Sequence, residues 1–242
     1  MAANRYVALH KELYASDCFK VINRLVIFKQ SLKLFLANFS ELEAAINCHV
    51  NAPLSDIRDM QARRKAQEEM FEVLRHLHNS VAAAISLVDH TRNFYNWFYR
   101  DALLIPEYQE QINFRFTGHG LSEFVKCLRQ FCQHYRIPLV GSTVSFDNEH
   151  GGYTRTVDLH KADLDKFSGW SSPAKSYIEA LPETIDLLSV MRSYRDHVVN
   201  FYEWFNHRLS DVHAADLANY DRIMTEIEHI QAEDPLYRDY QP

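Results

Sequence analysis

The fold of this chain is decided by residues 21–46, which read VINRLVIFKQSLKLFLANFSELEAAI. Large apolar side chains recur there at alternating steps of four and three residues: Val21, Leu25, Phe28, Leu32, Phe35, Phe39, Leu42 and Ile46. That spacing keeps one face of an α-helix apolar for about seven turns, as in a helix bundle or an antiparallel helix pair. Proline and short polar residues interrupt the pattern at 51–53, so we expect a long helix that ends there.

A second long helix is expected to begin at about Ser55 and to run to Phe98. Charged residues crowd its first half, where Arg63-Arg-Lys65 is interpreted as a solvated face. Its apolar positions are Leu74, Leu77, Val81, Ala84, Val88, Tyr95 and Phe98. Since only a short connection at Ala52–Pro53 separates the two helices, we predict antiparallel neighbours.

Glycine is scarce in this chain and confined to its middle. All six glycines lie between Gly118 and Gly169, whereas sheet-rich folds need glycine in many tight turns. We therefore predict an all-α protein, a bundle of long antiparallel helices. One inserted β-hairpin is expected at about residues 138–159, because β-branched runs flank a glycine-containing turn around His150. The chain is interpreted as one domain, 1–242, with a hairpin and loop insert at 138–169.

Shorter helices are expected from Pro106, over 121–135, from Ser172, over 183–209 and over 211–232. The helix at 121–135 should bury one face and end before Pro138. The residues expected on that face are Leu121, Phe124, Val125, Leu128, Phe131 and Cys132.

Charge and cysteine content limit the classes of protein to consider. The formal net charge is −6, whereas a protein that coats nucleic acid usually carries a basic excess. The four cysteines form no CxxC pair, and the polar N-terminus does not resemble a secretory signal, so reduced thiols and a cytoplasmic location are expected. No stretch favours a membrane span. Phosphate-loop, dinucleotide and zinc-protease motifs are missing, so no cofactor or metal is expected.

An internal similarity links residues 86–98, SLVDHTRNFYNWF, with residues 193–205, SYRDHVVNFYEWF. Eight of the thirteen positions are identical. Two interpretations remain open. Two helices can pack in similar surroundings, or an ancient duplication can have left two matched half-sites.

The candidate site lies in residues 128–138, LRQFCQHYRIP. Arg129 is followed five positions later by His134, at the end of a helix in an all-α protein. This pattern resembles the R-x4–6-H motif of the HEPN superfamily, over about residues 55–136. Members are helical bundles, and many of them dimerise and cleave RNA without a metal ion. The resemblance implies that Arg129 and His134 are catalytic, with Gln130 as the polar neighbour of the arginine.

The resemblance also implies the partners: RNA, a second copy of the chain in a homodimer, and a protein such as an antitoxin in a bacterial stress or phage-defence system. The chemistry is consistent with that role. Histidine can act as acid or base near neutral pH, and arginine offers a forked cation to phosphate oxygens. On an α-helix, five residues turn about 500°, so the two side chains should diverge by about 140°. With Gln130, the expected substrate-binding residues are Lys126, Arg136 and His119, the last from the loop before the helix.

Spacing alone does not select this pair. Four other pairs share it: Arg5/His10, Arg155/His160, Arg192/His197 and Arg208/His213. The apolar helix face before Arg129 and the stop at Pro138 favour Arg129/His134, and the repeated segment makes Arg192/His197 the runner-up. The alternative is that Arg129 pairs with an acidic residue, and that the protein is a non-enzymatic helical module that binds nucleotides or proteins or dimerises.

Overall fold

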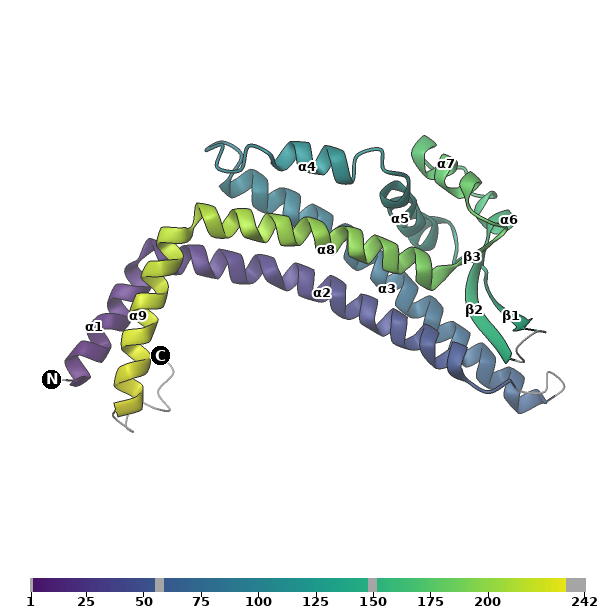
Figure 1. Ribbon diagram of the computed structural model, residues 1–242, viewed down its shortest axis with the longest axis horizontal. Coiled ribbons are helices and arrows are strands. Elements are labelled where there is room, and N and C mark those ends of the chain that lie inside the picture. Colours follow the sequence, from purple (N-terminus) through teal and green to yellow (C-terminus); the bar gives the residue numbers. More distant parts are fainter. Residues whose placement is uncertain (1, 55–58, 148–151, 234–242) are drawn as a thin grey trace.

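The computed structural model describes residues 2–54, 59–147 and 152–233. Helix α2 (Asp17–Asn51) contains the apolar stripe of residues 21–46, and every member of the stripe is buried except Leu32, which is half-buried. Helix α3 (Met60–Phe98) returns beside it in the opposite direction (Figure 1), which confirms the predicted antiparallel pair. Its predicted start at Ser55 lies outside the described residues.

Side-chain caps mark where both long helices begin. Ser16 accepts a hydrogen bond from the backbone N–H of Phe19 at 3.2 Å, and Asp59 accepts one from Gln61 at 2.8 Å. Such caps satisfy N–H groups that have no partner within the helix.

The buried face of α3 departs from the prediction at three positions. Leu77, Val81, Ala84 and Tyr95 are buried as expected, but Leu74 and Phe98 are half-buried, and Val88 is 45% exposed. Its side chain borders a cavity between α3 and neighbouring helices instead of packing against α2.

The middle of the chain holds the short elements. Helix α4 (Tyr108–Arg115) and helix α5 (Gly120–Gln130) are followed by a π-helical turn, η1 (Phe131–Tyr135). Strands β1 (Val140–Asp147) and β2 (Gly152–His160) pair antiparallel, with Val140 opposite Leu159. This confirms the inserted hairpin in a mostly helical fold, while His150 lies outside the described residues. Helices α6 (Lys161–Leu164) and α7 (Ser172–Ala180) follow.

The single helix predicted at 183–209 is wrong at its start. Residues Thr184–Asp186 form a third strand, β3, that pairs antiparallel with β2 and places Ile185 opposite Leu159. Both of these side chains are buried. Helix α8 (Leu187–Val212) begins only after Asp186, whose carboxylate accepts a hydrogen bond from the N–H of Leu188 at 3.0 Å. The pairing with β2 and this N-cap together set the helix start.

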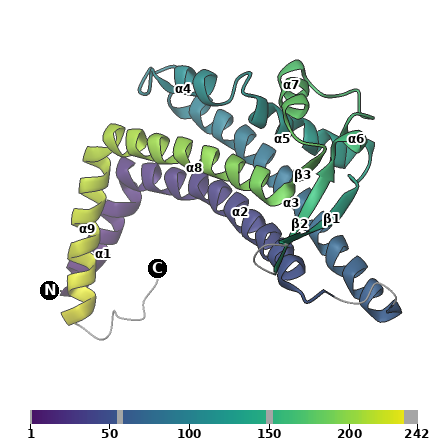
Figure 2. The ribbon, with the colours of Figure 1, turned by 45° about the vertical axis from the view of Figure 1, so that its right-hand side comes forward.

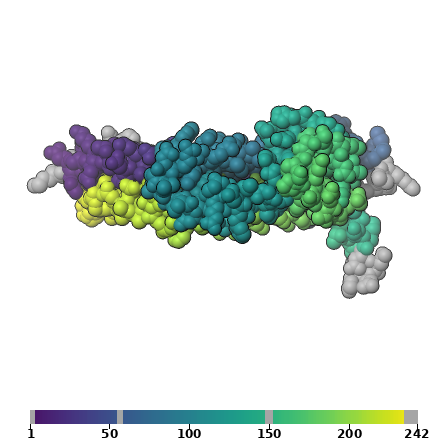
Figure 3. Space-filling model, turned by 90° about the horizontal axis from the view of Figure 1, so that it is seen from above, coloured from purple at the N-terminus to yellow at the C-terminus, as the bar shows by residue number. Residues whose placement is uncertain are grey.

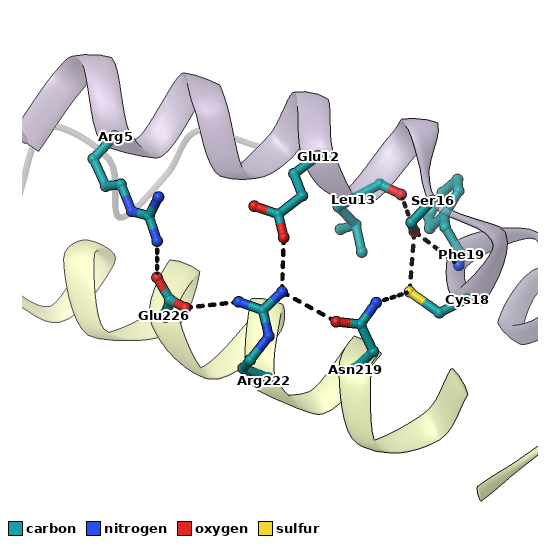
Figure 4. Close-up of polar contacts among 9 residues, drawn as sticks. All are labelled: Arg5, Glu12, Leu13, Ser16, Cys18, Phe19, Asn219, Arg222 and Glu226. Carbon is teal, nitrogen blue, oxygen red and sulfur yellow. Dashed lines mark hydrogen bonds and ion pairs between the residues drawn. The ribbon is translucent and has the colours of Figure 1, made fainter. Parts of the chain in front are cut away.

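A two-helix arm leaves the end of the bundle (Figures 1 and 2). It consists of α1 (Ala2–Ala15), which the sequence analysis did not predict, and α9 (Ala214–Glu233), close to the predicted 211–232. The arm has its own small apolar cluster, separate from the main core: Tyr6, Leu9, Leu13, Cys18, Ile223 and Ile227. Figure 4 shows the polar contacts along its surface, where Arg222 pairs with Glu12 at 2.7 Å and with Glu226 at 2.9 Å.

All four cysteines are unpaired, with Cys48 exposed and the other three buried. Over the described residues, no helix combines the length and apolar character needed to cross a bilayer.

Candidate functional site

Helix α5 and the turn η1 present the two residues of the Arg-x4-His motif on the surface. The six apolar residues predicted to face inward from this helix are all buried. With that face fixed in the core, Arg129 is left half-buried in the last turn of α5, and His134 is exposed in η1. His134 is therefore not enclosed by apolar side chains.

The π-helical turn changes the angle between these two side chains. In η1 the backbone N–H of Arg136 donates to the carbonyl of Phe131 at 3.0 Å, a bond between residues five apart. A turn closed by such bonds holds more residues than an α-helical turn, so positions five apart come nearer to one face. The angle between the side chains of Arg129 and His134, about 140° on a regular α-helix, is therefore smaller in this structure. Single π-helical turns of this kind occur often at functional sites.

Arg129 differs from the other four arginines of the motif in having no polar partner among the described residues. Arg5 pairs with Glu226, and Arg192 donates to Glu43 at 2.7 Å. Arg208 donates to the carboxylates of Glu107 and Asp211. Arg155 donates to the backbone carbonyls of His49 and Ala52. Arg129 makes no hydrogen bond or ion pair with any residue that the structure describes. Its guanidinium is thus available to an anion from outside the chain.

Two cations predicted to bind substrate each have an acidic partner within the protein. Lys126 lies 3.2 Å from Glu123 and is exposed. Arg136 pairs with the buried carboxylate of Asp163, which also accepts a hydrogen bond from the N–H of Leu139 at 2.9 Å. Arg136 therefore joins the end of η1 to α6 and to the segment that leads into β1. Gln130 is exposed, beside Arg129.

His119 lies away from the Arg129–His134 turn. It directly precedes α5, whose eleven residues extend about 16 Å, and the turn is at the other end. Its ring stacks on that of His197, with centroids 4.6 Å apart. Burial lowers the pKa of His197, which donates from Nε2 to the carbonyl of Arg115. His119 thus lies beside His197, the histidine of the Arg192/His197 pair, and Arg192 itself is bound to Glu43 in α2.

The hairpin lies beside the ends of α2 and α3 (Figure 2). A basic cleft is lined by residues of these three elements. It has a volume of about 790 Å³, and its charged and titratable lining consists of His49, Arg63, Lys65, Glu69 and Arg155. His49 is 2% exposed and donates from Nδ1 to Glu69 at 2.9 Å, while its Nε2 has no partner among the described residues. Three permanent cations and one carboxylate line the cleft, so its net charge favours an anion although the chain is acidic overall. Two of the cations also have partners within the chain: Arg155 donates to the carbonyls of His49 and Ala52, and Lys65 lies 3.9 Å from Glu69.

Sequence reasoning missed this cleft because its residues are far apart along the chain. Arg63, Arg64 and Lys65 are exposed, as predicted for a solvated face. The sequence did not indicate that Arg63 and Lys65 line a cleft that Arg155 reaches from β2. The hairpin that carries Arg155 projects from the helical body (Figure 3). Val140, another residue of the lining, is six positions after His134. That length of chain spans at most about 20 Å.

In the described part of the chain, no three histidine, cysteine, aspartate or glutamate side chains are grouped as ligands for a metal ion. Comparison with protein-family models, with curated proteins and with solved structures found no match.

Proposed function

We propose that this chain is a HEPN-like, metal-independent endoribonuclease that acts as a homodimer, with Arg129 and His134 at the cleavage site. One observation carries the proposal. Of the five arginines with this spacing, Arg129 alone has no polar partner among the described residues, and its histidine is exposed on a π-helical turn.

The chemistry requires a base, an acid and a group that stabilises negative charge, and two copies of the Arg129–His134 pair supply all three. The 2′-oxygen of a ribose attacks the adjacent phosphorus while its proton passes to a base, and the bond to the 5′-oxygen of the next nucleotide breaks as that oxygen gains a proton. The products are a 2′,3′-cyclic phosphate and a 5′-hydroxyl. His134 serves as base or acid, and Arg129 stabilises the negative charge that develops on the phosphate oxygens.

A second copy of the chain supplies the missing proton-transfer group. One histidine cannot accept the 2′-hydroxyl proton and donate another in the same step. In a homodimer with the two turns side by side, the partner presents a second arginine and histidine. We therefore expect the specific activity to fall when dilution separates the two copies.

The basic cleft supports RNA as the substrate. Arg63, Lys65 and Arg155 can contact phosphates of the strand on one side of the bond that is cut. Contacts of this kind supply most of the affinity for nucleic acid without reading its sequence.

The test is cleavage of labelled single-stranded RNA by the purified full chain in EDTA, with analysis of the new ends. Wild type should leave 2′,3′-cyclic phosphates, and His134→Ala and Arg129→Ala should each lower the rate about 100-fold or more. Arg192→Ala is the matched control, because it removes an arginine of the same spacing that is already bound to Glu43. No cleavage by wild type, or equal cleavage by all variants, refutes the proposal.

A non-enzymatic binding module is the second candidate, and one observation favours it. Trp97 in the first repeated segment is 74% exposed, whereas its counterpart Trp204 packs on Phe201 with ring centroids 5.7 Å apart. An exposed tryptophan is typical of a surface that meets a partner. RNA binding without cleavage, lost in Trp97→Ala, would support this function instead.

A further inference from the structure

A cavity of about 470 Å³ lies between α3, α4, α5 and α8. Both repeated segments contribute to its wall, the first through Thr91 and Arg92 and the second through Val198, Phe201 and Tyr202. Its volume is within the range of pockets that hold small molecules. The Arg129–His134 turn is not part of this lining. The cavity therefore has no role in the ribonuclease proposal.

The interior of the cavity is apolar, and the charges at its edge cancel in pairs. Leu87, Ile112, Phe116 and Val198 are among its lining residues. Arg92 donates to Asp89 at 2.8 Å, and Lys126 donates to Glu123 at 3.2 Å. Because each charge already has an opposite partner, the cavity favours a neutral ligand over an ion.

Three buried residues in this lining carry a hydroxyl group that has no hydrogen-bond partner among the described residues. Ser122 is 8% exposed, Tyr108 5% and Tyr194 2%. The hydroxyl of Ser122 is a fully buried atom with no hydrogen-bond partner among the described residues. The phenol hydroxyls of Tyr108 and Tyr194 belong to buried residues and likewise make no hydrogen bond with any residue that the structure describes. By contrast, the hydroxyls of Thr91 and Tyr202, in the same lining, share a hydrogen bond. Buried polar groups are rarely left unpaired, since losing water without gaining a partner is costly.

All three groups are hydrogen-bond donors at neutral pH. Burial raises the pKa of both Tyr108 and Tyr194 well above the usual value for tyrosine. Both phenols therefore keep their protons, and the serine hydroxyl is always protonated. A ligand that satisfies them must offer oxygen or nitrogen acceptors.

We propose that this cavity binds a small, neutral ring molecule with carbonyl or ether oxygens, which accept hydrogen bonds from Ser122, Tyr108 and Tyr194. The apolar and aromatic wall covers the rings. The hydroxyls fix the orientation of the ligand, because they are the unpaired donors in an otherwise apolar space.

Three probes of similar size separate the contributions of shape, hydrogen bonding and charge. Coumarin is a neutral fused bicycle with a lactone carbonyl and a ring oxygen, naphthalene has the rings alone, and coumarin-3-carboxylate adds a negative charge. Isothermal titration calorimetry of the full chain should show saturable binding of coumarin at one site. Naphthalene and the carboxylate should each bind at least about tenfold more weakly, the first because it forms no hydrogen bonds and the second because its charge loses water without a partner.

Removing single hydroxyls tests the assignment of the donors. Tyr194→Phe and Ser122→Ala should each weaken coumarin binding about threefold to tenfold and leave naphthalene binding no weaker. Tyr177→Phe is the matched control, since Tyr177 is half-buried outside the lining, and it should leave coumarin binding unchanged. Ala84→Leu, which adds bulk inside the lining, should abolish binding of both neutral probes.

Four results would overturn the proposal. They are no saturable binding of coumarin, naphthalene binding as tight as coumarin, unchanged coumarin binding in both hydroxyl variants, and coumarin binding that survives Ala84→Leu. Thermal unfolding of each variant identifies any that fails to fold. The comparison of the three probes on wild type holds without the variants.

Discussion

Replacing Asp163 with alanine should destabilise the protein by about 3 kcal/mol. The carboxylate is 3% exposed and holds both Arg136 and the N–H of Leu139. Breaking a buried ion pair by removing one partner costs about 3–5 kcal/mol, because the other charge is left buried. Since the side chain of Arg136 is 33% exposed and can turn toward water, we expect the lower end of this range.

Urea denaturation followed by circular dichroism measures this loss. For a chain of this length, about 3 kcal/mol corresponds to a fall of about 6–12 °C in the melting temperature. Asp165→Ala is the matched control, because Asp165 is exposed and only two positions away, and it should change the stability by less than about 0.5 kcal/mol.

A double-mutant cycle with Arg136→Ala assigns the role of the arginine. If Arg136 acts mainly through Asp163, the double variant should be little less stable than Asp163→Ala alone. If Asp163→Ala is as stable as Asp165→Ala, or if the two substitutions add in full, then the ion pair does not anchor the turn. Arg136 would in that case be free to contact substrate, as the sequence analysis predicted.

Three further predictions concern the core, the response to pH and the basic cleft. The ring of Phe28 stacks on that of Phe94 with centroids 4.3 Å apart, so Phe28→Ala should lower the free energy of unfolding, measured by urea denaturation, by about 3–5 kcal/mol. The neighbouring Ile27 is 71% exposed, and Ile27→Ala should lower it by less than about 0.5 kcal/mol. Equal losses in the two variants would refute the assignment of Phe28 to the core. Because burial lowers the pKa of His197 in the folded chain, the unfolded chain binds more protons, so stability should fall as the pH drops below about 6.5; thermal melts of His197→Gln should show a smaller fall, and an equal fall would contradict this origin. If Arg63 contacts an RNA phosphate, Arg63→Ala should reduce the slope of log affinity against log salt by about 0.7 in a filter-binding assay, and an unchanged slope would exclude that contact.

The long helices could be predicted from sequence because their information is local. The steps of four and three between Val21 and Ile46 fix the buried face of α2 without reference to any other element. The short helix α1 carried a weaker signal of the same kind, since Tyr6, Leu9 and Leu13 are three and four residues apart. That signal was too short to predict a helix without its partner α9. Strand β3, with three residues, shows no periodicity at all and is recognised only by its pairing with β2.

The candidate site was predictable in its composition but not in its geometry. The spacing of Arg129 and His134 gave no sign that the intervening turn is π-helical, because the same residues fit either hydrogen-bond pattern. Nor did it indicate that Asp163, 27 positions after Arg136, would take up that arginine. His119 is near the motif in sequence, but a rigid helix separates them in space. Hydrogen bonds and ion pairs between distant segments decide such points.

The two-helix arm has a consequence for the order in which the protein assembles. Its contacts join the two ends of the chain, as in the hydrogen bond from Gln231 to Tyr6, which spans 225 positions. Helix α1 is synthesised before α9, yet its apolar side is covered only when α9 has been made. Residues 17–212 lie between the two helices of the arm, so α1 must wait for α9 until this whole segment has been made. Until then Tyr6, Leu9 and Leu13 remain open to chaperones or to a neighbouring nascent chain.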